Sequence, residues 1–125
     1  MPKKAVFQPR WLEQPDEQDY PAAESYLSLI YSAAKSAKFA AALRKVKCVE
    51  FAAKDIFRAS GLPMIGVSNS HVHRDQKKIS AGKAISPLLL VRDRANGKVI
   101  IADGYHRLCA VYTFDEDACI PCKIV

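Results

Sequence analysis

Two runs of consecutive apolar residues dominate the C-terminal third of the chain. Residues 87–92 read PLLLVR and residues 98–102 read KVIIA, so both runs are rich in branched aliphatic side chains. Because such runs are typical of strands that are covered on both faces, they predict two buried strands. The Asn96-Gly97 dipeptide between them is the strongest short signal for a β-hairpin.

A helix over residues 105–114 and a last strand over residues 120–124 are expected to follow this hairpin. Upstream of the hairpin, residues 48–51 predict a short strand. Residues 54–59 predict a short helix that Gly61 stops.

Residues 71–80 predict a further helix, which Asn69 or Ser70 caps and Gly82 ends. The order of these elements predicts an α+β fold with a small mixed sheet and packed helices, preceded by one or two N-terminal helices.

Helical periodicity extends over residues 22–47, which are rich in alanine, leucine and lysine. Pro21 suits the first turn of a helix, and Ser36 marks a candidate break between two helices. The expected apolar face comprises Tyr26, Leu29, Ile30, Ala33, Ala34, Phe39, Leu43 and Val46.

The first 20 residues contain three prolines and predict an irregular arm that Trp11 anchors to the body of the protein. We therefore expect an N-terminal arm and helical extension over residues 1–47. The main domain is expected over residues 48–125, and the two parts form one compact unit.

Length and composition suit a single core, because half of the 125 residues are hydrophobic. No apolar run approaches the ~20 residues of a membrane span, and the N-terminus lacks the apolar stretch of a signal peptide. We therefore expect a cytoplasmic protein without membrane partners. Nineteen basic and thirteen acidic residues give a net charge of +6, which favours anionic partners such as DNA, nucleotides or phosphorylated metabolites.

Four cysteines are too few and too unevenly placed to predict a disulfide framework. Cys119 and Cys122 form a C-x-x-C pair, but the pair leads into a strand, which aims the two side chains in opposite directions. We expect both to be buried structural cysteines.

The stretch IADGYHRLCAV, residues 101–111, carries the clearest candidate chemistry. At a helix start the free N–H groups hold anions. Gly104 allows a ligand to approach the backbone closely, while Arg107 offers a fork of donors to phosphate oxygens. Asp103 has two competing uses: it is a good helix N-cap, or it turns away and leaves the N–H groups to a phosphate, which a divalent cation can bridge to it.

The order of the motifs resembles the ParB/sulfiredoxin superfamily. Residues 85–91 (ISPLLLV), 99–110 (VIIADGYHRLCA) and 120–124 (IPCKI) follow that superfamily's three blocks. The resemblance covers about residues 48–125. The matching positions are Gly82, Pro87, Asp103, Gly104, Arg107, Ala110 and Pro121.

This resemblance implies a small α+β fold in which the glycine-x-x-arginine helix start faces a nucleotide or phosphate. Gly104, Tyr105, His106 and Arg107 would then contact phosphates, with Asp103 near Mg²⁺ or an acceptor hydroxyl. Asp103 and His106 are the candidate catalytic residues, and a nucleoside di- or triphosphate with Mg²⁺ is the implied cofactor. Tyr105 stands where sulfiredoxin needs its cysteine, so the resemblance does not extend to sulfinic acid reduction. No helix-turn-helix motif of the ParB type follows.

Two further residues are candidate phosphate contacts. Lys83 lies in a segment of small residues before the hairpin. His71 begins the predicted helix over residues 71–80, and in the family the matching helix also precedes the hairpin. His71 and His73 would share a face only on a strand, so the predicted helix argues against a two-histidine metal site.

Three hypotheses of function follow. In the first, a ParB-like domain binds a nucleotide or phosphate group at the DGYHR helix start and is associated with DNA. In the second, a metal-dependent phosphotransferase, similar to a free-serine kinase, acts on a small hydroxyl compound. In the third, a non-catalytic protein binds DNA or a protein partner through the basic helices of residues 35–47. A dimer is compatible with each of these hypotheses.

Overall fold

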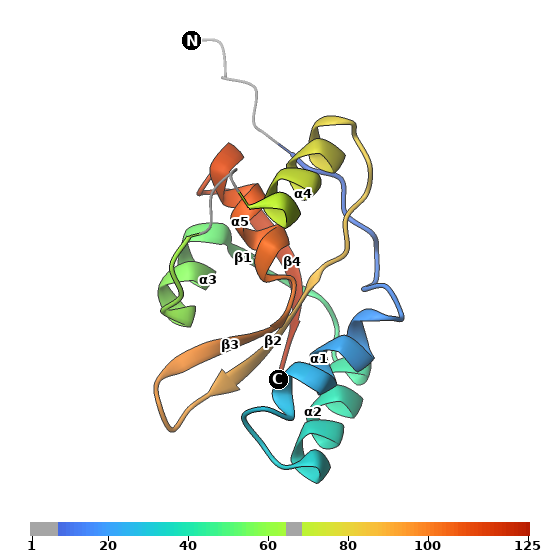
Figure 1. Cartoon of the computed structure of the whole chain (residues 1–125), viewed down its shortest axis with the longest axis vertical. Helices are drawn as coiled ribbons and strands as arrows, with labels where there is room; N and C mark the ends of the chain where they lie inside the picture. Colours follow the sequence, from blue (N-terminus) through green and yellow to red (C-terminus); the bar gives the residue numbers. More distant parts are fainter. Residues whose placement is uncertain (1–7, 65–68) are drawn as a thin grey trace.

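The computed structural model describes residues 8–64 and 69–125, so the first seven residues of the predicted arm and part of the loop after residue 63 lie outside the described residues. The described chain forms an α+β fold, as the sequence predicts (Figure 1). Its elements are α1 (Asp19–Leu27), α2 (Ala33–Lys45), β1 (Val49–Ala52), α3 (Ala53–Ser60), α4 (Ser70–Ser80), β2 (Leu88–Asp93), β3 (Lys98–Asp103), α5 (Tyr105–Phe114) and β4 (Cys119–Ile124). No described helix is long and apolar enough to cross a membrane.

The four described strands form one mixed sheet in the order β1-β4-β2-β3. The predicted hairpin is confirmed: β2 and β3 pair antiparallel, and the turn between them contains Gly97 with a φ of 64°. β4 pairs parallel with β2 and antiparallel with β1. β2 is therefore an inner strand, and residues 88–91 are all buried, as their continuous apolar run predicts.

Helices cover both faces of the sheet and produce two cores (Figure 1). On one face, α3, α4 and α5 pack against the side chains of Leu88, Leu90 and Ile101. On the other face, α1 and α2 pack against Leu89, Val91 and Ile100. Alternate residues of β2 thus serve opposite cores, which follows from the two-residue period of a strand.

The break between the first two helices lies at residues 28–32, not at Ser36. Ser32 stops a continuous helix because its Oγ accepts a hydrogen bond from the Lys35 N–H (3.1 Å) and caps α2. Ser36 is buried inside α2. The predicted apolar face is therefore wrong at this point: Leu27 is fully buried, whereas Leu29 is 84% exposed.

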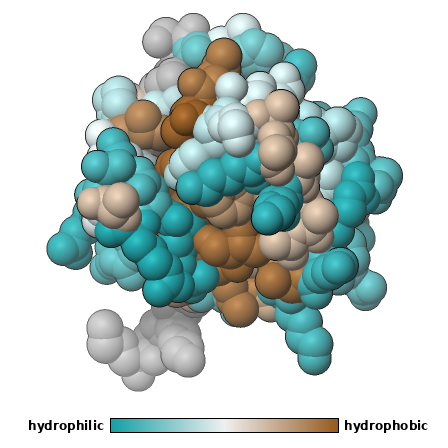
Figure 2. All heavy atoms as spheres, turned by 90° about the horizontal axis from the view of Figure 1, so that it is seen from below, coloured by the Kyte–Doolittle hydropathy of each residue, from teal (hydrophilic) through white to brown (hydrophobic). Residues whose placement is uncertain are grey.

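The turn after α1 leaves apolar side chains on the surface. A band of apolar atoms crosses the lower face of the molecule between polar segments (Figure 2). The exposed large apolar residues at the end of α1 and in the following turn are Tyr26, Leu29 and Ile30. None of them contributes to either core.

The N-terminal arm is attached beside the segment that precedes β2. The Leu12 N–H donates to the Ile85 carbonyl (2.8 Å), and the Ile85 N–H donates to the Arg10 carbonyl (2.9 Å). Trp11 packs against the core below α4 and α5, which confirms its predicted role as an anchor. This attachment carries the chain toward Ser86 and leads directly into α1.

The position of the helix break makes a direct prediction for two leucines. We expect Leu27→Ala to lower the free energy of unfolding by about 2–5 kcal/mol, because it opens a cavity in a filled core. Leu29→Ala should change it by less than about 0.5 kcal/mol, because that side chain lies in solvent. Urea denaturation of the two variants beside the wild type measures both effects. Equal losses would place the helix break elsewhere.

Candidate functional site

Gly104 makes the turn from β3 into α5 and has no substitute at this position. Its φ of 105° lies in the region that side chains disfavour. A Cβ atom there would lie 2.8 Å from Leu88 Cγ and 2.9 Å from Arg107 Nη2. The glycine and the arginine of the DGYHR stretch are therefore coupled, since the guanidinium group folds back over the place that a Cβ would occupy.

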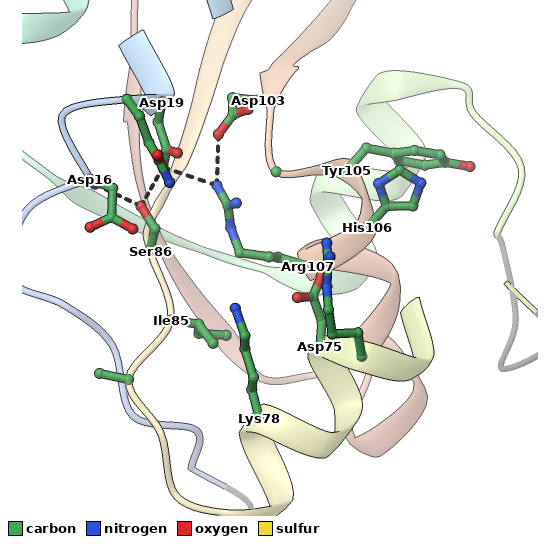
Figure 3. Close-up of a pocket in the computed structure, with 14 residues that line it drawn as sticks. Asp16, Asp19, Asp75, Lys78, Ile85, Ser86, Asp103, Tyr105, His106 and Arg107 are labelled. Atoms are coloured by element: carbon green, nitrogen blue, oxygen red, sulfur yellow. Dashed lines mark hydrogen bonds and ion pairs between the residues drawn. The ribbon is translucent and has the colours of Figure 1, made fainter. Parts of the chain in front are cut away.

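Arg107 is the centre of a buried network of polar groups (Figure 3). Its Nη2 donates to Asp103 Oδ2 (2.9 Å), to the Pro87 carbonyl (3.4 Å) and, at the limit of hydrogen bonding, to Asp19 Oδ2 (3.5 Å). The side chains of Arg107, Asp19 and Asp103 are 18%, 10% and 20% exposed. Arg107 Nε is buried and has no hydrogen-bond partner among the described residues.

Ser86 extends this network to the N-terminal arm. Its Oγ donates to Asp19 Oδ2 (2.5 Å) and accepts from the Asp16 N–H (3.0 Å). The network thus joins β3, α5, the start of α1 and the residues before β2. Each of these segments supplies a group that another segment needs, so the site is part of the fold and not an addition to its surface.

The hypothesis that Asp103 caps α5 is wrong. The N-cap position is Gly104, and no side chain caps this helix. Asp103 points to Arg107 instead, and it leaves the first N–H groups of α5 without a side-chain acceptor (Figure 3). The sequence allows an anion at this helix start only if Asp103 points away from it, and in the structure Asp103 does point away.

A pocket of about 270 Å³ lies in front of this helix start. The arm, α4, the segment before β2 and the start of α5 line it, almost entirely with polar side chains (Figure 3). Its lining residues with formal charge are Asp16, Asp19, Asp75, Asp103, Arg74, Lys78 and Arg107. Four carboxylates thus face three cations, which makes the pocket mixed in charge and not simply basic.

Three titratable groups of the DGYHR stretch have shifted pKa values, and burial raises that of Tyr105. Burial raises the pKa of Asp103, and the nearby Asp19 carboxylate adds to the rise, while Arg107 opposes it. Burial likewise lowers the pKa of His106, and the neighbouring His71 adds to that fall. His106 is therefore a neutral hydrogen-bonding group near pH 7.

The structure brings some of the sequence-predicted site residues together and separates others. Gly104, Tyr105, His106 and Arg107 line the pocket. The Tyr105 hydroxyl, however, donates to the Pro63 carbonyl, which is not part of the lining. His71 does not line the pocket, but its ring packs on that of His106 with centroids 4.9 Å apart. Lys83 is exposed and is not part of the lining.

Nine residues of the pocket lining escaped prediction as site residues, namely Asp16, Gln18, Asp19, Arg74, Asp75, Lys78, Ala84, Ile85 and Ser86. Asp75 is only 7% exposed, and no hydrogen bond or ion pair within the described chain engages its carboxylate. Asp75 and Lys78 could have been found from the helical spacing of α4, since residues three apart share a face. Asp19 carries no local signal, because only the folded arm brings it to Arg107.

The remaining candidate sites are weaker. In the part of the chain that the structure describes, no three His, Cys, Asp or Glu side chains gather as a metal site would need. His71 and His73 lie on a helix, as predicted. Cys122 is buried, and burial raises its pKa to about 12, but Cys119 is exposed, so the prediction of two buried cysteines is wrong for Cys119.

The basic face of α2 is partly engaged within the molecule. Arg44 pairs with Glu17 and lies over the Tyr20 ring at 4.3 Å, and Lys35 lies over the Tyr31 ring at 4.7 Å. Lys38 and Lys45 are exposed on the same helix. The cations of residues 35–47 therefore hold α2 against its neighbours as well as facing solvent.

Comparison with known proteins identifies no relative: no protein-family model, no curated protein and no solved structure matches this chain.

The close contacts of Gly104 predict an unequal response to alanine at two glycines. Gly61 also has a positive φ, of 68°, but open space surrounds its Cβ position. We expect Gly61→Ala to lower the free energy of unfolding by about 1–2 kcal/mol, from backbone strain alone. Gly104→Ala should lower it by about 1–3 kcal/mol more, because Leu88 and Arg107 must also move. Chemical denaturation of both variants tests this, and equal losses would contradict the role of the Arg107 contact.

The raised pKa of Asp103 predicts how stability changes with pH. Above about pH 3.8, the ordinary value for this group, the unfolded chain releases the Asp103 proton while the folded chain retains it. The unfolded state then binds fewer protons, so this contribution to stability falls as pH rises through the raised pKa. We expect the wild type to lose stability relative to Asp103→Asn as pH rises from about 3.8 through the raised pKa, measured by denaturation at each pH. If the wild type instead gains stability relative to Asp103→Asn as pH rises, the ion pair with Arg107 outweighs burial and the pKa of Asp103 is lowered.

Proposed function

We propose that this chain is a ParB/sulfiredoxin-like domain that binds a phosphate group, of a nucleotide or of a phosphorylated small molecule, at the start of α5. The observation that carries the proposal is the uncapped helix start in front of a polar pocket. Backbone N–H groups and the helix dipole together favour an anion at such a place. The order of the sequence motifs supports the same site.

Two cations of α4 support this anion site from the opposite wall. Arg74 and Lys78 are one turn apart on α4, and both line the pocket. In Figure 3, the Lys78 side chain extends from α4 into the pocket. No ion pair within residues 8–64 and 69–125 engages Lys78. Its ammonium group is thus available to a ligand phosphate, whereas Arg107 is already held by two carboxylates.

The Asp75 carboxylate is a second feature of the pocket that supports ligand binding. Asp75 is nine-tenths buried, lines the same pocket and has no hydrogen-bond partner in the described chain. The Asp75 carboxylate oxygens open into the pocket, where a bound molecule with a donor group can hydrogen-bond to them. Both ends of the pocket therefore present groups that a ligand can satisfy.

Adjacent lysines on α4 provide a matched test with inorganic phosphate as the probe. We expect Lys78→Ala to weaken phosphate binding by roughly threefold to tenfold, because it removes a charged donor from the pocket. Lys77→Ala should leave binding unchanged, since Lys77 has the same charge but does not line the pocket. Isothermal titration calorimetry measures both affinities, and the rise in melting temperature with phosphate gives a second readout.

Two outcomes of this experiment would contradict the proposal. One is the absence of any phosphate binding to the wild type. The other is an equal loss in both variants, which would mean that the net charge of the protein attracts the anion and that the pocket has no part in it.

A further inference from the structure

The charges of the pocket separate into a satisfied set and an available set. Asp19 and Asp103 both pair with Arg107, so this set holds two carboxylates and one guanidinium that are engaged with one another. The charged groups without an ion pair among the described residues are two carboxylates, Asp16 and Asp75, and two cations, Arg74 and Lys78. Arg74 Nη2 also lies 3.2 Å from His71 Nδ1, so Lys78 is the less engaged of the two cations. A ligand that fits this pocket must therefore offer something to both signs.

The cationic groups suit a single phosphate. A phosphomonoester carries about 1.5–2 negative charges at pH 7, which Lys78, Arg74 and the start of α5 can balance. A triphosphate brings more negative charge than these groups offer, and its further oxygens would lie near Asp75 and Asp16. Like charges at such distances repel one another strongly in a partly buried site.

The acidic groups suit hydroxyl donors. Asp75 is 7% exposed and faces the pocket from α4, as Figure 3 shows. Asp16 and Gln18 line the side of the pocket that the arm forms. Carboxylate and amide oxygens accept hydrogen bonds, so hydroxyl groups of a ligand can donate to them.

The walls do not favour a nucleobase. Bases bind by stacking on aromatic faces, and Tyr105 and His106 are the aromatic residues of the described lining. The Tyr105 hydroxyl is bound to the Pro63 carbonyl, and the His106 ring is packed on His71. The volume of about 270 Å³ also lies below the ~300–1,000 Å³ of pockets that enclose drug-sized ligands.

We propose that the pocket binds a small polyhydroxyl compound with a single phosphate group, in preference to a nucleotide. The phosphate lies at the start of α5 beside Lys78, and hydroxyl groups donate to Asp75 and to the acceptors of the arm. This inference rests on the proposed phosphate site and adds the class of ligand to it.

A panel of four ligands tests the inference with the unmodified protein. Calorimetric titrations compare ribose 5-phosphate, inorganic phosphate, AMP and ATP, the last with and without Mg²⁺. We expect ribose 5-phosphate to bind at least tenfold more tightly than inorganic phosphate, because its hydroxyl groups satisfy the buried carboxylate. AMP should gain nothing over ribose 5-phosphate, and ATP should bind more weakly than either.

Asp75→Asn locates the recognition of the hydroxyl groups. The amide keeps the shape of the side chain but removes its charge, so we expect about tenfold weaker binding of ribose 5-phosphate. Binding of inorganic phosphate should be unchanged or slightly tighter, because a nearby negative charge is lost. Asp55→Asn is the matched control, since Asp55 is an exposed helical aspartate that does not line the pocket.

The outcomes separate the two proposals. If inorganic phosphate binds as tightly as ribose 5-phosphate, the inference about hydroxyl groups is overturned and the phosphate site stands. If AMP or ATP binds most tightly, the ligand is a nucleotide and the inference is again overturned. If none of the four binds, both proposals fail. The ligand panel decides these points even if Asp75→Asn does not fold.

Discussion

The position of the Arg107 guanidinium determines how the rest of the site is built. It lies among acceptors from three separate segments, namely Asp103 at the end of β3, Asp19 at the start of α1 and the Pro87 carbonyl before β2. A buried cation is tolerable only when its acceptors converge on it, and removing one partner of such a pair typically costs about 3–5 kcal/mol. Arg107 therefore links the start of the first helix, the residues before β2 and the end of β3, in addition to the core packing and backbone hydrogen bonds that hold the same segments. Gly104 belongs to the same constraint, because the guanidinium occupies the space of its missing Cβ.

The open helix start of α5 is a consequence of this arrangement. A positive group in the first turn of a helix is unfavourable with respect to the helix dipole. Asp103 and Asp19 offset that effect, and in doing so Asp103 turns away from the N–H groups that it would otherwise cap. The competition between capping and ligand binding, which the spacing of DGYHR leaves open, is decided by the residue one turn further along the helix. The N–H groups then depend on solvent or a ligand for their hydrogen bonds, as the groups at any uncapped helix start do.

Local sequence signals predict the elements of residues 48–125 well but not the composition of the pocket. The Asn96-Gly97 turn, the apolar runs beside it and the helix of residues 105–114 all form as predicted, because each depends on neighbours in sequence. The predicted position of the first helix break is wrong. Helix propensity alone favours a continuous helix, but the Ser32 side chain caps a new helix and so begins α2 at this point. Asp19 and Ser86 are 67 residues apart, yet their side chains share a hydrogen bond. Sequence periodicity does not predict a contact over this separation, so the place of Asp19 in the site could be found only from the folded structure.

The charge of the whole molecule and the charge of the pocket act at different distances. The net charge of +6 raises the local concentration of any anion near the surface. It gives no selectivity, because salt screens it within about 10 Å at an ionic strength of 0.1 M. Selection must arise inside the pocket, where four carboxylates and three cations line the same space. Such a lining rejects a ligand of purely negative charge more strongly than an apolar wall would, because each unmatched carboxylate is repelled at short range. This mixed lining is the reason for which we propose a ligand whose anionic group is compact and whose remaining surface donates hydrogen bonds.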